Sequence, residues 1–167
     1  NQSLIQLPGQ QEEETTEPTS TVQLAEKGAF TLAVRNNNLN QVQLGQTFFV
    51  TVLASSEDSS IVGFDALLTY DRDAFTLGQA TTPLQSFQLF AKDQDDYQSY
   101  TAALSPNATA SVFSETEILS IPFTPIQAGK YTFELLSEAG GETTKMVEDA
   151  TTNVFAPQVS TLQVTVY

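Results

Sequence analysis

The stretch SIVGFDALLTYDRDAF, residues 60–75, alternates apolar and polar side chains and then enters an acidic corner. A period of two is typical of a β-strand with one buried face. The pattern predicts that one set of side chains faces the core: Val62, Phe64, Ala66, Leu68 and Tyr70. The corner, Asp71-Arg72-Asp73, is either a carboxylate pair for chemistry or the turn that ends the strand.

The same alternation continues along most of the chain, as in FTLAV (30–34) and TFFVTVLA (47–54). Gly, Asn, Ser and Pro separate these segments, and no longer window keeps a helical period. We therefore expect an all-β fold, a two-sheet antiparallel β-sandwich of about nine or ten strands. Pro122 interrupts one strand, and because it cannot donate to a ladder we expect an edge strand or a bulge there.

The first 28 residues differ from the rest, because they are rich in Gln, Glu and Thr and carry little to bury. This composition is typical of a solvated tail or linker. The expected domains are a linker over residues 1–28 and a sandwich over residues 29–167. Two apolar islands in the linker, SLIQL (3–7) and TVQLA (21–25), would form strands if a sheet edge were offered to them.

The charge and the missing residue types exclude several functions. The chain has 20 acidic and 6 basic residues, a formal net charge of −14, so phosphate backbones and anionic headgroups are repelled. No apolar run is long enough for membrane insertion. The sequence has no Cys and no His, which rules out a Ser-His-Asp triad and a His-ligated zinc site. We expect no enzyme activity, no catalytic residue and no cofactor.

Two acidic clusters and two tyrosines are candidate sites. We interpret Asp71 and Asp73 as a turn in which Asp71 accepts backbone N–H groups and Arg72 is solvated. The loop AKDQDDY (91–97) would suit calcium, but it lacks the EF-hand pattern, so we favour a solvated acidic loop and predict no metal site. Tyr97 and Tyr100 are three residues apart and point to opposite faces of a strand, which does not make a platform for polysaccharide.

Several segments together resemble the cohesin domain family. They are LGQTFFVTV (44–52), VGFDALLTYDRDAFTL (62–77), EILSIPFTPIQAGKYTFEL (117–135) and VSTLQVTVY (159–167). The resemblance covers about residues 30–167. It implies a nine-stranded jelly-roll sandwich, without enzyme activity, that binds dockerin modules through one sheet face and joins proteins on bacterial surfaces.

The candidate partner-binding residues lie on the strand quoted first. If its apolar set faces the core, alternation turns Asp65, Leu67 and Thr69 outward. The resemblance implies that Asp65 matches a position that contacts the dockerin. An outward Leu beside Asp and Thr would suit a binding surface, and the alternative is that a loop covers Leu67.

The predicted function is therefore a non-catalytic extracellular interaction module that binds a dockerin-like protein. The first alternative is a structural subunit of an extracellular fibre or surface layer, in which copies of the chain assemble by strand donation from the N-terminal tail. A carbohydrate-binding module is the third choice. Because the sequence starts at Asn rather than Met, we expect a mature product, secreted or attached to the cell surface.

Overall fold

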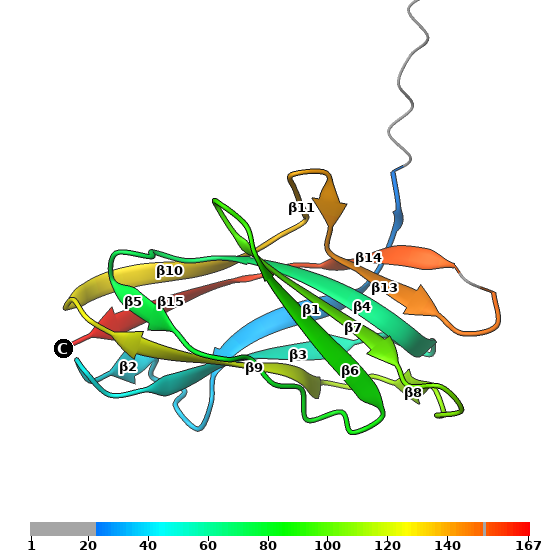
Figure 1. Ribbon diagram of the computed structural model, residues 1–167, viewed down its shortest axis with the longest axis horizontal. Helices are drawn as coiled ribbons and strands as arrows, with labels where there is room; N and C mark the ends of the chain where they lie inside the picture. Colours follow the sequence, from blue (N-terminus) through cyan, green and yellow to red (C-terminus); the bar gives the residue numbers. More distant parts are fainter. Residues whose placement is uncertain (1–22, 152) are drawn as a thin grey trace, which may run out of the picture.

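The computed structural model describes residues 23–151 and 153–167, and within them every regular element is a β-strand (Figure 1). The strands are β1 (Ala25–Val34), β2 (Gln41–Val42), β3 (Phe48–Ser55), β4 (Ser60–Thr69), β5 (Phe75–Leu77), β6 (Phe87–Asp93), β7 (Gln98–Leu104), β8 (Ser111–Val112), β9 (Thr116–Pro125), β10 (Gly129–Leu136), β11 (Glu138–Ala139), β12 (Glu142–Thr143), β13 (Lys145–Glu148), β14 (Val154–Gln158) and β15 (Thr161–Val166). The predicted all-β sandwich is confirmed. The strand number exceeds the expected one because four elements have only two residues.

The strands form two layers around one core. One layer has the order β5-β9-β3-β1, and the other has the order β6-β7-β4. The pair β13–β14 connects β4 to β1 of the first layer, so the layers share one continuous hydrogen-bonded sheet. On the other branch, β10 leads from β4 to β15 and then to β2. Contrary to the expectation of a wholly antiparallel sandwich, β1 pairs with β14 in parallel, and β2 pairs with β15 in parallel. These partners lie far apart in the sequence, so no hairpin fixes their relative direction.

The strand β4 has partners on both sides. β7 pairs with it along one edge, from Gly63 to Leu68. Along the other edge β10 pairs with its last residues, Leu67 to Thr69, and β13 pairs with its earlier part, Ile61 to Asp65. β10 and β13 thus lie one after the other along the same edge of β4. The hairpin β11–β12 leaves the sheet between them.

Aromatic side chains fill the core between the layers. Phe64 of β4 meets Phe30 of β1 edge to face, with ring centroids 6.2 Å apart, and Phe113 at 6.3 Å. Phe123 of β9 and Phe133 of β10 form a second contact at 4.9 Å. Each such ring buries a large apolar area, and these contacts join strands of both layers.

The predicted core face of β4 is right for most positions and wrong for Val62. Ile61 is fully buried, whereas Val62 is half-exposed. The register between β4 and β13 shifts between Gly63 and Ile61, so Val62 is the extra residue of a β-bulge, which inverts the alternation before it. The later members of the predicted face are buried in the core: Phe64, Ala66 and Leu68.

Pro122 lies inside β9, between β3 and β5, and the expected edge strand or bulge at this residue is wrong. Its carbonyl accepts a hydrogen bond from the N–H of Gly78 at 2.8 Å, just after β5 ends at Leu77. The N and O atoms of one strand residue face the same neighbouring strand, so the nitrogen of Pro122 also faces the β5 side of β9. The β5 ladder has already ended at this point, so no strand residue there needs an N–H from Pro122. The sheet therefore loses no ladder bond at Pro122.

Most of the expected linker, residues 1–22 with the island SLIQL, lies outside the described residues. The rest of it differs from the expectation, because β1 begins at Ala25, which pairs with Phe155. Residues 25–28 therefore belong to the sandwich. No helix in the described ranges is long and apolar enough to cross a membrane.

Gly28 and Gly45 give a matched test of this packing. Both have a left-handed φ, 74° and 79°, but a Cβ on Gly28 would lie 2.2 Å from the carbonyl oxygen of Ser55, whereas a Cβ on Gly45 meets nothing within 4 Å. We expect Gly45→Ala to cost about 1 kcal/mol from backbone strain alone. Gly28→Ala should cost roughly 3 kcal/mol, the sum of strain and overpacking, measured by urea unfolding. Equal losses for the two variants would contradict the close approach of β1 to β3.

Candidate functional site

The outer face of β6, β7, β4 and β13 carries the residues predicted to bind a partner. The ladders place one residue of each strand in a single row across this face. The row consists of Phe90, Thr101, Asp65 and Lys145. We call these four residues the central row.

Asp65 faces outward, as the alternation predicts, and its carboxylate is held on both sides. The hydroxyl of Thr101 donates a hydrogen bond to Oδ1, and Nζ of Lys145 lies 3.5 Å from Oδ2. The side chain of Asp65 is 21% exposed, so part of the carboxylate remains open to solvent. The arrangement fixes a negative charge in one orientation at the centre of the face.

Thr69, at the end of β4, is half-exposed. Its Oγ1 donates a hydrogen bond to the carbonyl of Asp96 at 3.2 Å. The hydroxyl therefore binds the turn between β6 and β7. Thr69 shares the strand with Asp65 but lies two rows away from it.

Leu67 is completely buried, so the prediction that it is an exposed contact residue is wrong. Its side chain lies outside the central core cluster, on the outer face of β4, where β12 contacts this strand. The N–H of Leu67 donates to Oγ1 of Thr144 at 3.1 Å, and that hydroxyl donates to the carbonyl of Leu136 at 2.5 Å. Alternation gave the correct face, and the alternative that a loop covers Leu67 is the correct one.

The covering hairpin is attached through Glu142 to β7 and to the turn before it. Its carboxylate accepts hydrogen bonds from the hydroxyl of Tyr97 at 2.5 Å, from Ser99 at 3.2 Å and from the amide of Gln94 at 3.4 Å. The bond to Glu142 raises the pKa of Tyr97 to about 12, and it lowers the pKa of the Glu142 carboxyl. At the turn, a Cβ on Gly140 would lie 2.6 Å from the Tyr97 hydroxyl, so the hairpin sits directly on this ring.

Phe90 is the exposed aromatic residue of the central row, and sequence reasoning missed it. Its side chain is 59% exposed, whereas Phe87 on the same strand is buried. The signal was present in the sequence, because two Phe residues three apart on one strand must face opposite sides. An exposed ring in the same row as an oriented carboxylate, with Thr101 between them, is the feature of this surface most suited to protein contact.

The acidic corner is a turn, as predicted. Asp71 Oδ1 accepts the N–H of Asp73 at 3.0 Å. Arg72 was expected to be solvated, but it donates to Asp93 Oδ1 and to the carbonyl of Gln94, both at 2.8 Å. It therefore clamps the end of β6. Within the described ranges, no three acidic side chains lie close enough together to hold a metal ion.

Comparisons with known proteins identify the fold. No protein-family model matches the sequence, and no curated protein matches it. Among solved structures, a cohesin module from a family 33 glycoside hydrolase of Clostridium perfringens matches with a TM-score of 0.69 and 17% identity, over 84% of this chain and 96% of the other. The chain has a cohesin-like fold.

Two further cohesins extend the range of relatives. The sixth cohesin of Acetivibrio cellulolyticus scaffoldin B, solved in complex with a Cel5 dockerin, matches with a TM-score of 0.64 and 14% identity over 84% of this chain and 99% of that one. A non-cellulosomal cohesin from the archaeon Archaeoglobus fulgidus matches with a TM-score of 0.57 and 10% identity, over 83% and 91%. The cohesin resemblance and the jelly-roll class predicted from the sequence are confirmed.

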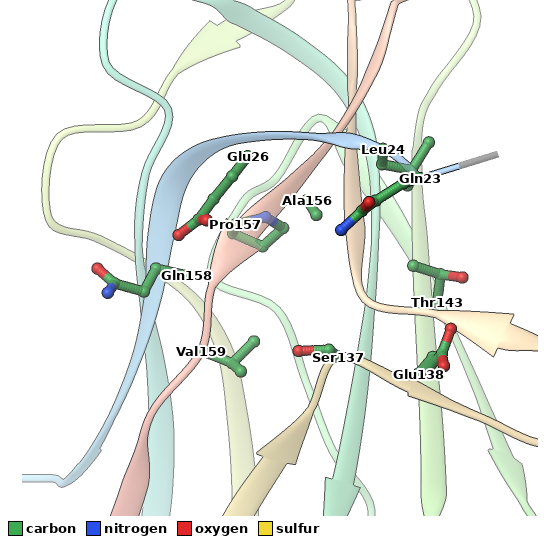
Figure 2. A pocket seen from close by; sticks show the side chains of 10 residues that line it. All are labelled: Gln23, Leu24, Glu26, Ser137, Glu138, Thr143, Ala156, Pro157, Gln158 and Val159. Carbon is green, nitrogen blue, oxygen red and sulfur yellow. The ribbon is translucent and has the colours of Figure 1, made fainter. Parts of the chain in front are cut away.

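A groove of about 700 Å³ opens at the base of the hairpin of this cohesin-like domain, where β1 and β14 begin to pair (Figure 2). Its lining combines aliphatic and neutral polar side chains with two carboxylates, Glu26 and Glu138. Figure 2 shows that these side chains come from β1, from β14 and from the hairpin with its stem. The lining has neither an aromatic ring nor a basic group, so the groove does not resemble a sugar or phosphate site.

The Thr144 hydroxyl bridges the Leu67 N–H and the Leu136 carbonyl, so its removal should lower the stability of the domain. Thr144→Val would leave the buried N–H of Leu67 without its acceptor, and we expect a cost of about 1–3 kcal/mol in urea unfolding. Thr143→Val, the matched control one residue away, lacks such a bridge in the described structure and should change stability by less than about 0.5 kcal/mol. If the two variants unfold alike, the hydroxyl of Thr144 does not hold the hairpin.

The lowered pKa of Glu142 predicts a pH-dependent hairpin. A carboxyl with a depressed folded-state pKa stabilises the closed hairpin above its unfolded pKa, and this contribution is lost as pH falls through the folded value. Amide exchange of Thr144, whose N–H donates to the Ser137 carbonyl at 2.9 Å across the hairpin stem, should show by NMR a protection that declines below about pH 4.5. Glu142→Gln should flatten this decline, and an unchanged profile in that variant would assign it to other carboxyls.

Proposed function

We propose that this protein is a non-catalytic extracellular interaction module that binds a dockerin-like protein through the outer face of β6, β7 and β4. The observation that carries the proposal is the central row, in which exposed Phe90 lies in line with the oriented carboxylate of Asp65. The fold supports it, because several similar solved structures are cohesin–dockerin complexes. Because the chain has neither His nor Cys, the proposal includes no enzyme activity.

The chemistry of the row defines the partner surface that it fits. Phe90 offers an apolar anchor at low conformational cost, since its strand is already ordered. Asp65 accepts hydrogen bonds from a Lys, Arg, Ser or Thr of the partner. The net charge of −14 favours a partner with a basic patch and accelerates the encounter with it. Such a patch opposite an apolar residue would match both parts of the row.

The set of proposed contact residues differs from the one predicted from the sequence, because Phe90 takes the place of Leu67. Asp65 and Thr69 remain in it, Phe90 is added, and Leu67 acts only by supporting the surface from below the hairpin. A charge at Leu67 would be buried without a partner and would unfold the domain rather than test the site. The alternative of a fibre subunit rests on the islands SLIQL and TVQLA. The first island and the first two residues of the second lie outside the described residues, and Ala25 of the second pairs with Phe155 of the same chain.

Phe90→Ala should weaken the complex by at least tenfold, because an aromatic anchor at the centre of an interface commonly contributes more than about 1.4 kcal/mol. Capture from extracellular extracts of the source organism would identify the dockerin-like protein, and titration calorimetry would give the affinity. Phe49→Ala is the matched control, since Phe49 is also exposed, at 38%, but lies on β3 in the other layer.

Asp65→Asn tests the charge while keeping the shape, and it should weaken binding less than Phe90→Ala and reduce the salt dependence of the association rate. Unchanged affinity in both variants would exclude this face as the partner site. A loss with Phe49→Ala alone would move the site to the opposite layer.

A further inference from the structure

The strand β6 is the long open edge of the domain. It has seven residues, and among the strands that the structure describes it pairs with β7 alone. Every other described strand that has a neighbour on a single side is short, with two or three residues, as β5 and β2 are. β6 contains no Pro, and its register with β7 has no bulge. Its devices against edge pairing are therefore limited to two charged residues at one end, Lys92 and Asp93.

The ladder with β7 decides which backbone groups of β6 are free. It is flanked by a bond from Gln94 N–H to the Tyr97 carbonyl at 2.9 Å and by one from Ser105 N–H to the Ser86 carbonyl at 2.8 Å. Antiparallel pairing alternates, so the even-numbered residues of β6 bond to β7. The N–H and C=O groups of Leu89 and Ala91 consequently point to the open edge.

We propose that this edge pairs with the β6 edge of a second copy of the chain, antiparallel and with the two-fold axis at Phe90. In this register Leu89 of one copy exchanges backbone hydrogen bonds with Ala91 of the other. The two Phe90 residues face each other in the non-hydrogen-bonded position, where Cα atoms approach to about 4.5 Å and side chains meet. Both rings lie on the outer face, where Phe90 is 59% exposed in the single chain.

The neighbouring residues favour this register over the adjacent ones. With the axis at Phe90, Lys92 lies opposite Gln88, and no two like charges are directly opposed. Moving the axis to Ala91 would place Phe90 opposite Lys92, so the two exposed rings would no longer meet each other. The strand is therefore self-complementary at one position, as an isologous dimer requires.

The dimer would have two physical consequences. The axis is perpendicular to the sheet, so both central rows would face the same side and form a bivalent surface. This inference goes beyond the single-site binding proposed above. Two chains of charge −14 repel each other, so added salt should strengthen the dimer by screening, which is the opposite of an interface built on ion pairs.

Sedimentation velocity of the full chain tests the proposal. We expect a reversible shift from monomer to dimer with rising concentration, and a larger dimer fraction in 0.5 M than in about 0.05 M NaCl. Ala91→Pro should abolish the dimer without unfolding the domain, because the N–H that it removes points away from β7 and bonds to no residue in the described part of the chain. Leu44→Ala, at an exposed apolar residue elsewhere, should leave the dimer intact. A chain that stays monomeric at every concentration and salt level would overturn the proposal.

The register is tested by cross-linking, since the protein has no cysteine of its own. Phe90→Cys should form a disulfide-linked dimer on mild oxidation, because the two sulfurs would meet at the axis. Lys92→Cys should not, because Gln88 of the partner lies opposite. Equal cross-linking of both variants would exclude this register.

Two further measurements separate the alternatives. A chain lacking residues 1–22 should dimerise as before, and loss of the dimer would show that the tail occupies the edge instead. Ala91→Pro should bind its protein partner with unchanged affinity per site. The dimer can therefore fail while the proposed partner site stands, and the reverse also holds.

Discussion

The pairing of β4 on both edges is the constraint on which the rest of the structure depends. β7 occupies one edge, and β10 with β13 occupies the other. Because β4 is fixed between them, its inner face must supply core residues such as Phe64, while its outer face places Asp65 between Thr101 and Lys145. The oriented carboxylate of the candidate site follows from the register of three strands.

Local sequence patterns predicted much of this arrangement. The alternation of the strand quoted first is enough to bury Ala66 and Leu68, and the Asx-type turn at Asp71 follows from its residue types. Alternation also gave the correct faces of Tyr97 and Tyr100. These features depend on neighbours within a few residues, which a single sequence contains.

The errors arose where distant segments decide the environment. Leu67 is covered by a hairpin more than seventy residues later in the chain, and nothing near Leu67 signals that contact. Val62 was misplaced because a bulge depends on the register with β13, which periodicity does not report. Phe90 differs from these two, because Phe87 and Phe90 lie three apart on one strand and local alternation already turns one of them outward.

The hairpin β11–β12 leaves the sheet at the end of β10 and returns at the start of β13, along the same edge of β4. Its ends are therefore held by the sheet whatever its middle contains. Glu142 and Thr144 attach it from outside, and it contributes no strand to the layers. Such a segment can be lengthened, shortened or exchanged in evolution while the sandwich keeps its topology, which makes it a natural place for related domains to diverge in what they recognise.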